Sequence, residues 1–148
     1  MPTSKQLLGA KAEILVTKRC GCPKCKRAGT LRRLPTNFKC ADVICDFCGY
    51  LAQVKGVSAS SLEECPPKIL GAAWGVQRKR MNAGIYFPLF VVLINSDGKA
   101  SIYYLSADLQ DRSIFKKRRP LSALAVRAGW QGFIYDLSLI LNRVVRVG

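Results

Sequence analysis

The stretch Ala41-Asp-Val-Ile-Cys-Asp-Phe-Cys-Gly-Tyr-Leu-Ala-Gln-Val-Lys55 decides the expected fold. Strand-forming residues occupy both of its ends and extend slightly beyond them, over Phe38 to Ile44 and over Tyr50 to Val57. Only the short segment Cys45 to Cys48 separates the two runs. The sequence therefore predicts two antiparallel strands that pair as a hairpin.

The register of this hairpin brings three polar residues together. If residues 46–49 form the turn, paired residue numbers sum to a constant, so Asp42 lies opposite Gln53. Strand alternation then places Gln53 and Lys55 on one face of the sheet. We therefore expect a carboxylate, an amide and an ammonium group to converge.

This trio suits the hydrolysis of a phosphodiester. The oxygens of Asp42 and Gln53 can hold Mg²⁺, which keeps several water ligands. A neighbouring Lys55 can orient or deprotonate a water and stabilise charge that develops on a phosphate. The chain contains no histidine, so the commonest general base is missing. The alternative interpretation of the trio is a solvated strand face without a catalytic duty.

A second Cys-x-x-Cys pair precedes the hairpin. Nineteen residues separate Cys25 of this pair from Cys45, a spacing typical of four-cysteine zinc sites. Zinc prefers four soft ligands in a tetrahedron, and the predicted ligands of a structural Zn²⁺ are Cys22, Cys25, Cys45 and Cys48. The other interpretations are disulfides, which need an oxidising compartment, and unrelated buried thiols.

Three further cysteines stand outside this predicted set. Cys20 could replace Cys22 as a ligand, whereas Cys40 and Cys65 are expected to be small buried residues. No segment at the N-terminus resembles a secretory signal, so we expect a cytoplasmic protein whose thiols stay reduced.

Length and charge indicate the class of protein. The 148 residues, 49% of them hydrophobic, are enough for a core, and we expect a single domain over residues 1–148. Twenty-four Lys and Arg against nine Asp and Glu give a formal net charge of +15, which favours nucleic acid as a partner, with an anionic membrane surface as the rival. The run Ile85 to Ile94 is too short to span a membrane and contains Pro88, so we expect a soluble protein.

Sequence patterning predicts further helices and strands. They are helices over Ser4 to Thr17 and Ala72 to Asn82, strands over Phe87 to Ile94 and Ser101 to Leu105, and a core element of either type over Phe133 to Leu141. The turn residues Ser96-Asp97-Gly98 join the two strands as a second hairpin. Together these segments indicate an α/β protein.

Basic runs and a tryptophan are candidates for contacts with nucleic acid. A charge run is usually only a solvated face, but several in a small domain favour a surface that follows phosphates. Trp130 lies between Gly129 and Gly132, which indicates an exposed turn, although a large aromatic residue is more often part of the core. The expected contacts are Arg78, Lys79, Arg80, Lys116, Lys117, Arg118, Arg119 and Trp130.

These motifs resemble a known family. Asp42 followed after ten residues by Gln53-Val54-Lys55 resembles the Asp and acid-x-Lys core of the PD-(D/E)xK nucleases. The Cys-x-x-Cys pair after Asp42, with the Cys-Pro-x-Cys knuckle before it, looks like the zinc-containing DpnI-type restriction endonucleases. Glu13 stands nine residues before that knuckle, where the family has a further acid. Arg127 to Gly132 and Asp136 to Ser138 resemble a later stretch of the same enzymes.

The resemblance covers about residues 12–57 and 126–139 and implies a fold and a reaction. The implied fold is restriction-endonuclease-like, a mixed β-sheet flanked by helices with the four-cysteine zinc knuckle inserted in the core hairpin. The implied function is a Mg²⁺-dependent endonuclease that hydrolyses double-stranded DNA, with or without dependence on adenine methylation. The implied catalytic residues are Asp42, Gln53, Lys55 and Glu13, with Mg²⁺ on Asp42 and Gln53.

Two features depart from the family pattern. Gln53 replaces the usual second acid, and a neutral oxygen ligand contributes less than a carboxylate to holding a hard cation. The chain ends soon after Asp136, so we expect no C-terminal winged-helix domain of the kind that helps fuller relatives read methylated adenine. The alternative functions are a weak or inactive zinc-stabilised nucleic-acid-binding module and an RNA-associated zinc protein. The recognition sequence, the number of Mg²⁺ ions and the oligomeric state stay open.

Overall fold

The structure is a computed structural model that describes residues 2–38 and 41–148. The chain divides into two compact units: unit 1 comprises Met1–Cys65, Phe87–Ala107 and Val144–Gly148, and unit 2 comprises Pro66–Tyr86 and Asp108–Arg143. Among the described residues, each unit combines one α-helix with one sheet, which confirms the predicted mixture of helices and strands. The expected single domain stays a prediction. Over the described ranges, no helix combines the length and the apolar character needed to cross a membrane.

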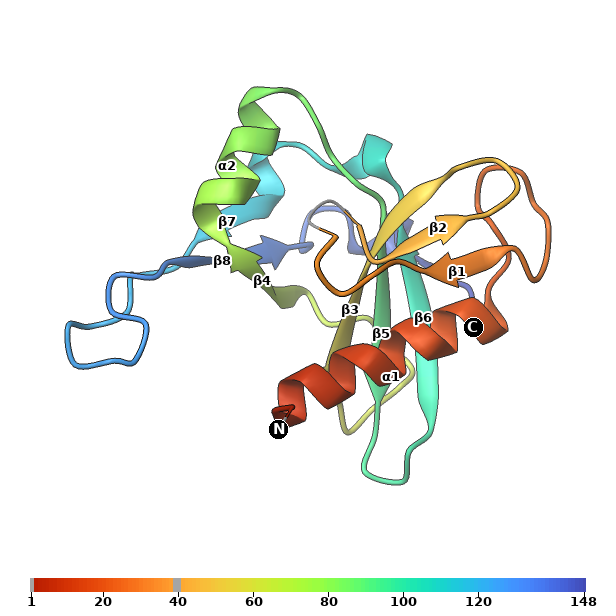
Figure 1. Ribbon diagram of the computed structural model, residues 1–148, viewed down its shortest axis with the longest axis horizontal. Coiled ribbons are helices and arrows are strands. Elements are labelled where there is room, and N and C mark those ends of the chain that lie inside the picture. The colour runs from red at the N-terminus through yellow and green to blue at the C-terminus, as the bar shows by residue number, and fades with distance from the viewer. Residues whose placement is uncertain (1, 39–40) are drawn as a thin grey trace. The chain divides into compact units, whose positions relative to one another are not determined.

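Unit 1 is built on a mixed sheet (Figure 1). In spatial order its strands are β1 (Leu31–Arg33), β2 (Val43–Cys45), β3 (Leu51–Ser58), β5 (Leu89–Ile94), β6 (Ala100–Leu105) and β9 (Val145–Arg146). Neighbouring strands are antiparallel except β3 and β5, which run parallel from Gln53 beside Leu89 to Ser58 beside Ile94. Parallel strands cannot be joined by a tight turn, and residues 59–88 form the crossover between them.

The helix α1 (Ser4–Arg19) packs on one face of this sheet. It begins with a capping box, in which Thr3 accepts a hydrogen bond from the Gln6 amide and the Gln6 side chain accepts one from the Thr3 amide. Ala12 and Val16 lie four residues apart and so occupy the same face of the helix. Both are fully buried, in a core that also contains Leu31, Val43, Ala52, Phe90, Val92 and Ile102.

A glycine on β3 allows α1 to lie close to the strand. A Cβ at Gly56 would stand 3.0 Å from the Leu8 carbonyl oxygen and 3.1 Å from the Ala12 Cβ. These distances are tighter than most contacts of a Cβ, so a side chain at this position would require α1 to shift by a few tenths of an ångström. This close approach determines how far α1 lies from the sheet. Glu13 is part of α1, so its distance from the sheet is determined in the same way.

Unit 2 is built on a smaller antiparallel sheet with an aromatic core. Its strands, in spatial order, are β4 (Lys68–Ala73), β8 (Gly132–Asp136) and β7 (Phe115–Lys117), and its helix is α2 (Trp74–Asn82). The Phe133 ring lies 5.7 Å from the Phe115 ring and 5.0 Å from the Tyr135 ring, and it covers Gly71, where a Cβ would collide with it. Short 3₁₀ helices occupy Ala107–Leu109, Arg112–Ile114 and Leu141–Arg143.

Most of the predicted elements are confirmed, with shifted ends. The first helix, the second strand of the hairpin with the second Cys-x-x-Cys pair, and the second hairpin begin and end within two residues of the prediction. The predicted helix from Ala72 begins only at Trp74, because Ala72 and Ala73 belong to β4. The undecided element over Phe133 to Leu141 begins as strand β8 and continues as turns.

One predicted strand is wrong at its beginning, and four strands were not predicted. The amide of Phe38 bonds to the carbonyl of Pro35 in a turn, and β2 begins only at Val43, whereas residues 39–40 of this prediction lie outside the described residues. The additional strands are β1, β4, β7 and β9. Three of them have only two or three residues, too few for a periodic pattern to show in the sequence.

We expect replacement of Gly56 by valine to lower the free energy of unfolding by about 1–3 kcal/mol, because the added atoms force α1 away from β3. The matched control is Gly9→Ala on α1, where an added Cβ meets nothing within 4 Å. That control should raise the free energy of unfolding by about 0.5–1 kcal/mol. Urea denaturation of both variants measures the difference, and equal stability of the two would contradict this account of the packing.

Candidate active site

Four cysteine thiols of unit 1 converge on one point. The Sγ atoms of Cys22 and Cys48 lie 3.6 Å apart, those of Cys25 and Cys45 lie 3.8 Å apart, and all four lie within 4.8 Å of one another. A tetrahedron with Zn–S bonds of about 2.3 Å has edges of about 3.8 Å. The four thiols therefore fit a Zn²⁺ ion, and the predicted set is the set that the fold assembles.

Tight turns present the two thiol pairs. In the first knuckle the amide of Lys26 bonds to the carbonyl of Cys22, and Lys26 has a positive φ of 65°. In the second knuckle the amide of Gly49, with a φ of 80°, bonds to the carbonyl of Cys45. Each turn closes a Cys-x-x-Cys loop, so that both thiols of a pair point to the same side.

The second knuckle also favours a thiolate. The amide of Cys48 donates to the Sγ of Cys45 over 3.4 Å, and the Thr30 hydroxyl lies 3.2 Å from the same sulfur. Burial alone would raise the pKa of Cys45, but its hydrogen bonding with the Thr30 side chain and with the amides of Cys48 and Phe47 lowers the pKa to about 6. Such hydrogen bonds to a sulfur orient a metal ligand and stabilise its charged form.

The remaining cysteines do not join this group in the described part of the chain. Cys20 caps the end of α1 and is buried, so it does not replace Cys22 in the cluster. Cys65 is buried, as predicted, and burial raises its pKa to about 11. The prediction for Cys40 lies outside the described residues.

The hairpin that carries the second knuckle has the predicted register. Val43 pairs with Ala52 and Ile44 with Leu51, so the residue numbers of both pairs have the predicted sum. The amide of Asp42 bonds to the carbonyl of Ala52 over 3.0 Å. The pairing of β2 with β3 extends only over residues 43–44 of β2, so the residues of β3 after Ala52 have no partner on β2.

Asp42 occupies the edge of β3 that β2 leaves open. Its Oδ2 accepts a hydrogen bond from the amide of Val54 over 2.7 Å. Val54 lies between Gln53 and Lys55, so the carboxylate is held beside the predicted Gln-x-Lys motif. Carboxylate oxygens are ligands that hard cations such as Mg²⁺ prefer.

Glu13 and Lys55 lie within electrostatic range of Asp42. Burial raises the pKa of Glu13, and the negative charge of Asp42 raises it further, against the effect of Arg33. The Arg33 Nε lies 3.2 Å from the Glu13 Oε1. Burial lowers the pKa of Lys55, and the positive charge of Lys5 lowers it further, whereas Asp42 raises it. Asp42 is thus the centre of a charged group drawn from a helix and two strands.

Gln53 is half-buried on β3, and its backbone amide donates a hydrogen bond to the carbonyl of Pro88 over 2.8 Å. This backbone bond directs the Gln53 amide towards β5, and the Val54 amide therefore points to the opposite edge, where Asp42 lies. The structure thereby places all four predicted catalytic residues in unit 1, on α1, before β2 and on β3.

Sequence reasoning missed two basic residues of this group. Arg33 forms the ion pair with Glu13, and Lys5 acts electrostatically on Lys55. Arg33 belongs to the short strand β1, and no local sequence pattern predicts that β1 lies beside α1 and β2. Lys5 is separated from Lys55 by fifty positions, so only the packing of α1 on β3 could bring them together.

The predicted nucleic-acid contacts lie on unit 2. Its described residues carry eleven Lys and Arg against three Asp. Lys116 to Arg119 are exposed on and after β7, and Arg78 and Lys79 are exposed on α2. Trp130 is half-buried with the Arg127 guanidinium 4.5 Å from the centre of its ring, whereas Trp74 packs against Phe133, consistent with a role in the core.

We expect Cys45→Ala to abolish stoichiometric zinc binding, because three thiolates leave the tetrahedron open. The matched control, Cys65→Ala, removes a buried thiol outside the cluster and should keep about one zinc per chain, like the unaltered protein. Elemental analysis of freshly purified protein measures both. Less than about half an equivalent in the unaltered protein would refute a tightly held structural zinc.

Comparison with known proteins agrees with this arrangement. No curated protein matches the sequence. The family model described as "DpnI: Dam-replacing family" matches residues 3–145, which include the cysteine cluster and all four candidate catalytic residues. This is a family of restriction-type nucleases, which act on DNA. Because the match extends over nearly the whole chain, the protein belongs to the DpnI, or Dam-replacing, family.

Proposed function

We propose that this protein is a Mg²⁺-dependent DNA endonuclease of restriction type, with a PD-(D/E)xK active site in a restriction-endonuclease-like fold. Membership of the DpnI family supports a nuclease. The observation that carries the proposal is the hydrogen bond from the Val54 amide to the Asp42 carboxylate, which holds an acid beside Gln53 and Lys55. Glu13 adds a second acid within electrostatic range of Asp42.

The residues divide the work of phosphodiester hydrolysis. Asp42 and Gln53 offer oxygen ligands to Mg²⁺, which, when bound, polarises a phosphate oxygen and lowers the pKa of a coordinated water. Lys55 orients the attacking water and stabilises negative charge on the phosphate. Glu13 adds negative charge that favours a cation next to Asp42, and its ion pair with Arg33 keeps it in place.

The zinc that we assign to the four cysteines has a structural role. When bound, it would join the knuckle after α1 to the knuckle between β2 and β3, and so hold the pairing of β2 with β3 next to Asp42. All four thiols are occupied in such a closed site, which leaves no position for substrate. The described cysteines form no disulfide, which suits the cytoplasmic location that we propose.

The basic residues of unit 2 are the proposed contacts to the phosphates of double-stranded DNA. They are Arg78, Lys79, Arg80, Lys116, Lys117, Arg118 and Arg119, with Trp130 as an aromatic contact to the bases. Contacts of this kind fix the position of a duplex without reading its sequence. Binding that depends on them weakens steeply as salt rises.

A zinc-stabilised nucleic-acid-binding module without turnover is the second candidate. It is favoured by one observation, the amide of Gln53 in place of a second carboxylate next to Lys55. Two carboxylates hold Mg²⁺ more firmly than one carboxylate and one amide. The net charge and the cysteine cluster suit both candidates equally well.

We expect the zinc-loaded protein to cut plasmid DNA in the presence of Mg²⁺, and Lys55→Ala to slow cutting by about 10²- to 10⁴-fold, because the water loses its orienting group. Plasmids with and without adenine methylation, together with phage DNA, are the substrates. Lys18→Ala removes the same charge from an exposed position on α1 and should leave the rate unchanged. Equal and negligible cutting by the unaltered protein and Lys55→Ala on every substrate would refute the nuclease proposal.

The variant Gln53→Glu separates the two candidate functions. In a nuclease, a second carboxylate beside Asp42 should preserve or increase the cutting rate at limiting Mg²⁺. In a non-catalytic module, the same variant should create no cutting, and DNA binding should be identical with Mg²⁺ and with EDTA too mild to remove zinc. Cutting rates as a function of Mg²⁺ concentration, measured beside DNA binding, decide between them.

A further inference from the structure

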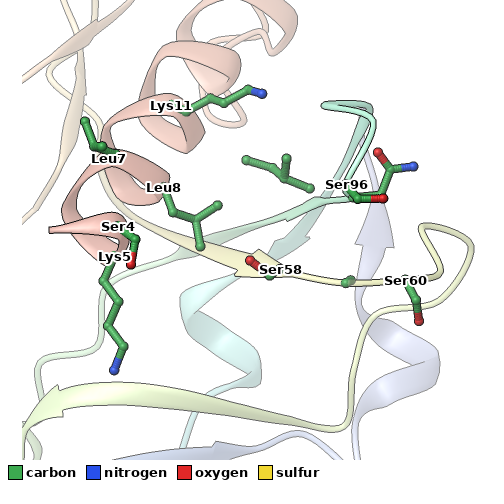
Figure 2. Close-up of a pocket in the computed structure, with 11 residues that line it drawn as sticks. Ser4, Lys5, Leu7, Leu8, Lys11, Ser58, Ser60 and Ser96 are labelled. Atoms are coloured by element: carbon green, nitrogen blue, oxygen red, sulfur yellow. The ribbon is translucent and has the colours of Figure 1, made fainter.

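A groove of about 780 Å³ opens on unit 1, next to the candidate active site (Figure 2). One wall is formed by the first two turns of α1, and the other by the chain that leaves the ends of β3 and β5. Figure 2 shows Leu8 pointing from α1 towards Ser58 at the end of β3. None of the residues that line the groove belongs to the cysteine cluster or to the candidate catalytic group.

The charge of the groove is positive. Lys5 and Lys11 line it, and the residues of its described lining include no acid. Both lysines are exposed on α1, and the Nζ of Lys11 lies 3.4 Å from the position that a Cβ of Gly98 would take. The first turn of α1 contains no acidic residue, so the partial positive charge of the helix terminus adds to that of the lysines.

The rest of the lining combines hydroxyl groups with apolar side chains. Ser58, Ser60 and Ser96 offer hydroxyl groups that can donate to phosphate oxygens. Leu8 and Ile94 form an apolar surface between them. Cations and hydroxyl groups around an apolar floor match the sugar and phosphate groups of a nucleic-acid backbone.

The groove lies close to the candidate active site. Ser58 follows Lys55 by three residues on β3, which corresponds to about 10 Å at the rise of a strand. Lys5 lies within electrostatic range of Lys55. In the described part of the chain β2 pairs with β3 only at Leu51 and Ala52, so no strand covers this edge of β3 between Lys55 and the groove.

We propose that this groove binds the sugar–phosphate backbone of the DNA that the protein cuts, with Lys5 and Lys11 as the phosphate contacts. The inference rests on the proposed function, because it takes DNA as the ligand and Lys55 as the site of cleavage. It adds a second binding surface, on the catalytic unit itself, to the basic residues of unit 2.

The test compares the double variant Lys5→Gln/Lys11→Gln with the matched variant Lys18→Gln/Lys99→Gln, which removes two exposed lysines outside the groove. Binding of the zinc-loaded full chain to a labelled duplex is measured over a range of salt concentrations without Mg²⁺, so that cutting plays no part. Each lost phosphate contact reduces the salt slope by about 0.9, so the groove variant should lose about two units and the matched variant none. Zinc content and thermal unfolding report whether both variants are folded.

Lysine acetylation followed by mass spectrometry gives an independent readout. In the unaltered protein, the duplex should protect Lys5 and Lys11 several-fold and leave Lys18 and Lys99 as reactive as before.

Equal salt slopes for the two variants, or unchanged acetylation of Lys5 and Lys11, overturn the proposal. A protein that fails to cut DNA but passes both tests refutes the nuclease proposal and retains the binding groove. If inorganic phosphate protects Lys5 and Lys11 from acetylation and the duplex does not, the proposal that the groove binds DNA is also overturned.

Discussion

The convergence of four thiols is the constraint on which the rest of unit 1 depends. Cys22 and Cys25 follow α1, whereas Cys45 and Cys48 lie in the turn between β2 and β3, so an ion held by all four thiols would tie a helix to a hairpin. Short strands supply few ladder hydrogen bonds, and β1 and β2 have three residues each. A metal ion bound by the four thiols would therefore help to fix the register of these strands, which their few hydrogen bonds define only weakly.

That register has a direct chemical consequence at Asp42. Because β2 stops accompanying β3 after Ala52, the amide of Val54 is left without a strand partner, and the Asp42 carboxylate takes its place. The carboxylate thus satisfies a backbone donor and at the same time comes to lie beside Gln53 and Lys55. The same arrangement that completes the hydrogen bonding of β3 also assembles the candidate site.

The parallel pairing of β3 and β5 shapes the surroundings of this site. Both strands end on the same side, where α1 begins, and the groove with Lys5 and Lys11 opens there. Ligands of open α/β sheets commonly bind outside the carboxyl ends of parallel strands. Strand β3 therefore carries the candidate active site along its edge and a candidate binding surface at its end.

The sequence by itself determined the elements whose signals are local. The Cys-x-x-Cys spacing identified the thiol cluster, the strand formers around the turn at residues 46–49 identified the pairing of β2 with β3, and the periodicity of α1 identified its helix. Only the tertiary structure decided that β3 and β5 pair in parallel, and that α1 packs closely on β3 at Gly56. It alone also decided that Arg33 and Lys5 lie near Glu13 and Lys55. These contacts join residues that are far apart in the chain, and their energy comes from burial and charge in the folded state, which no short window of sequence contains.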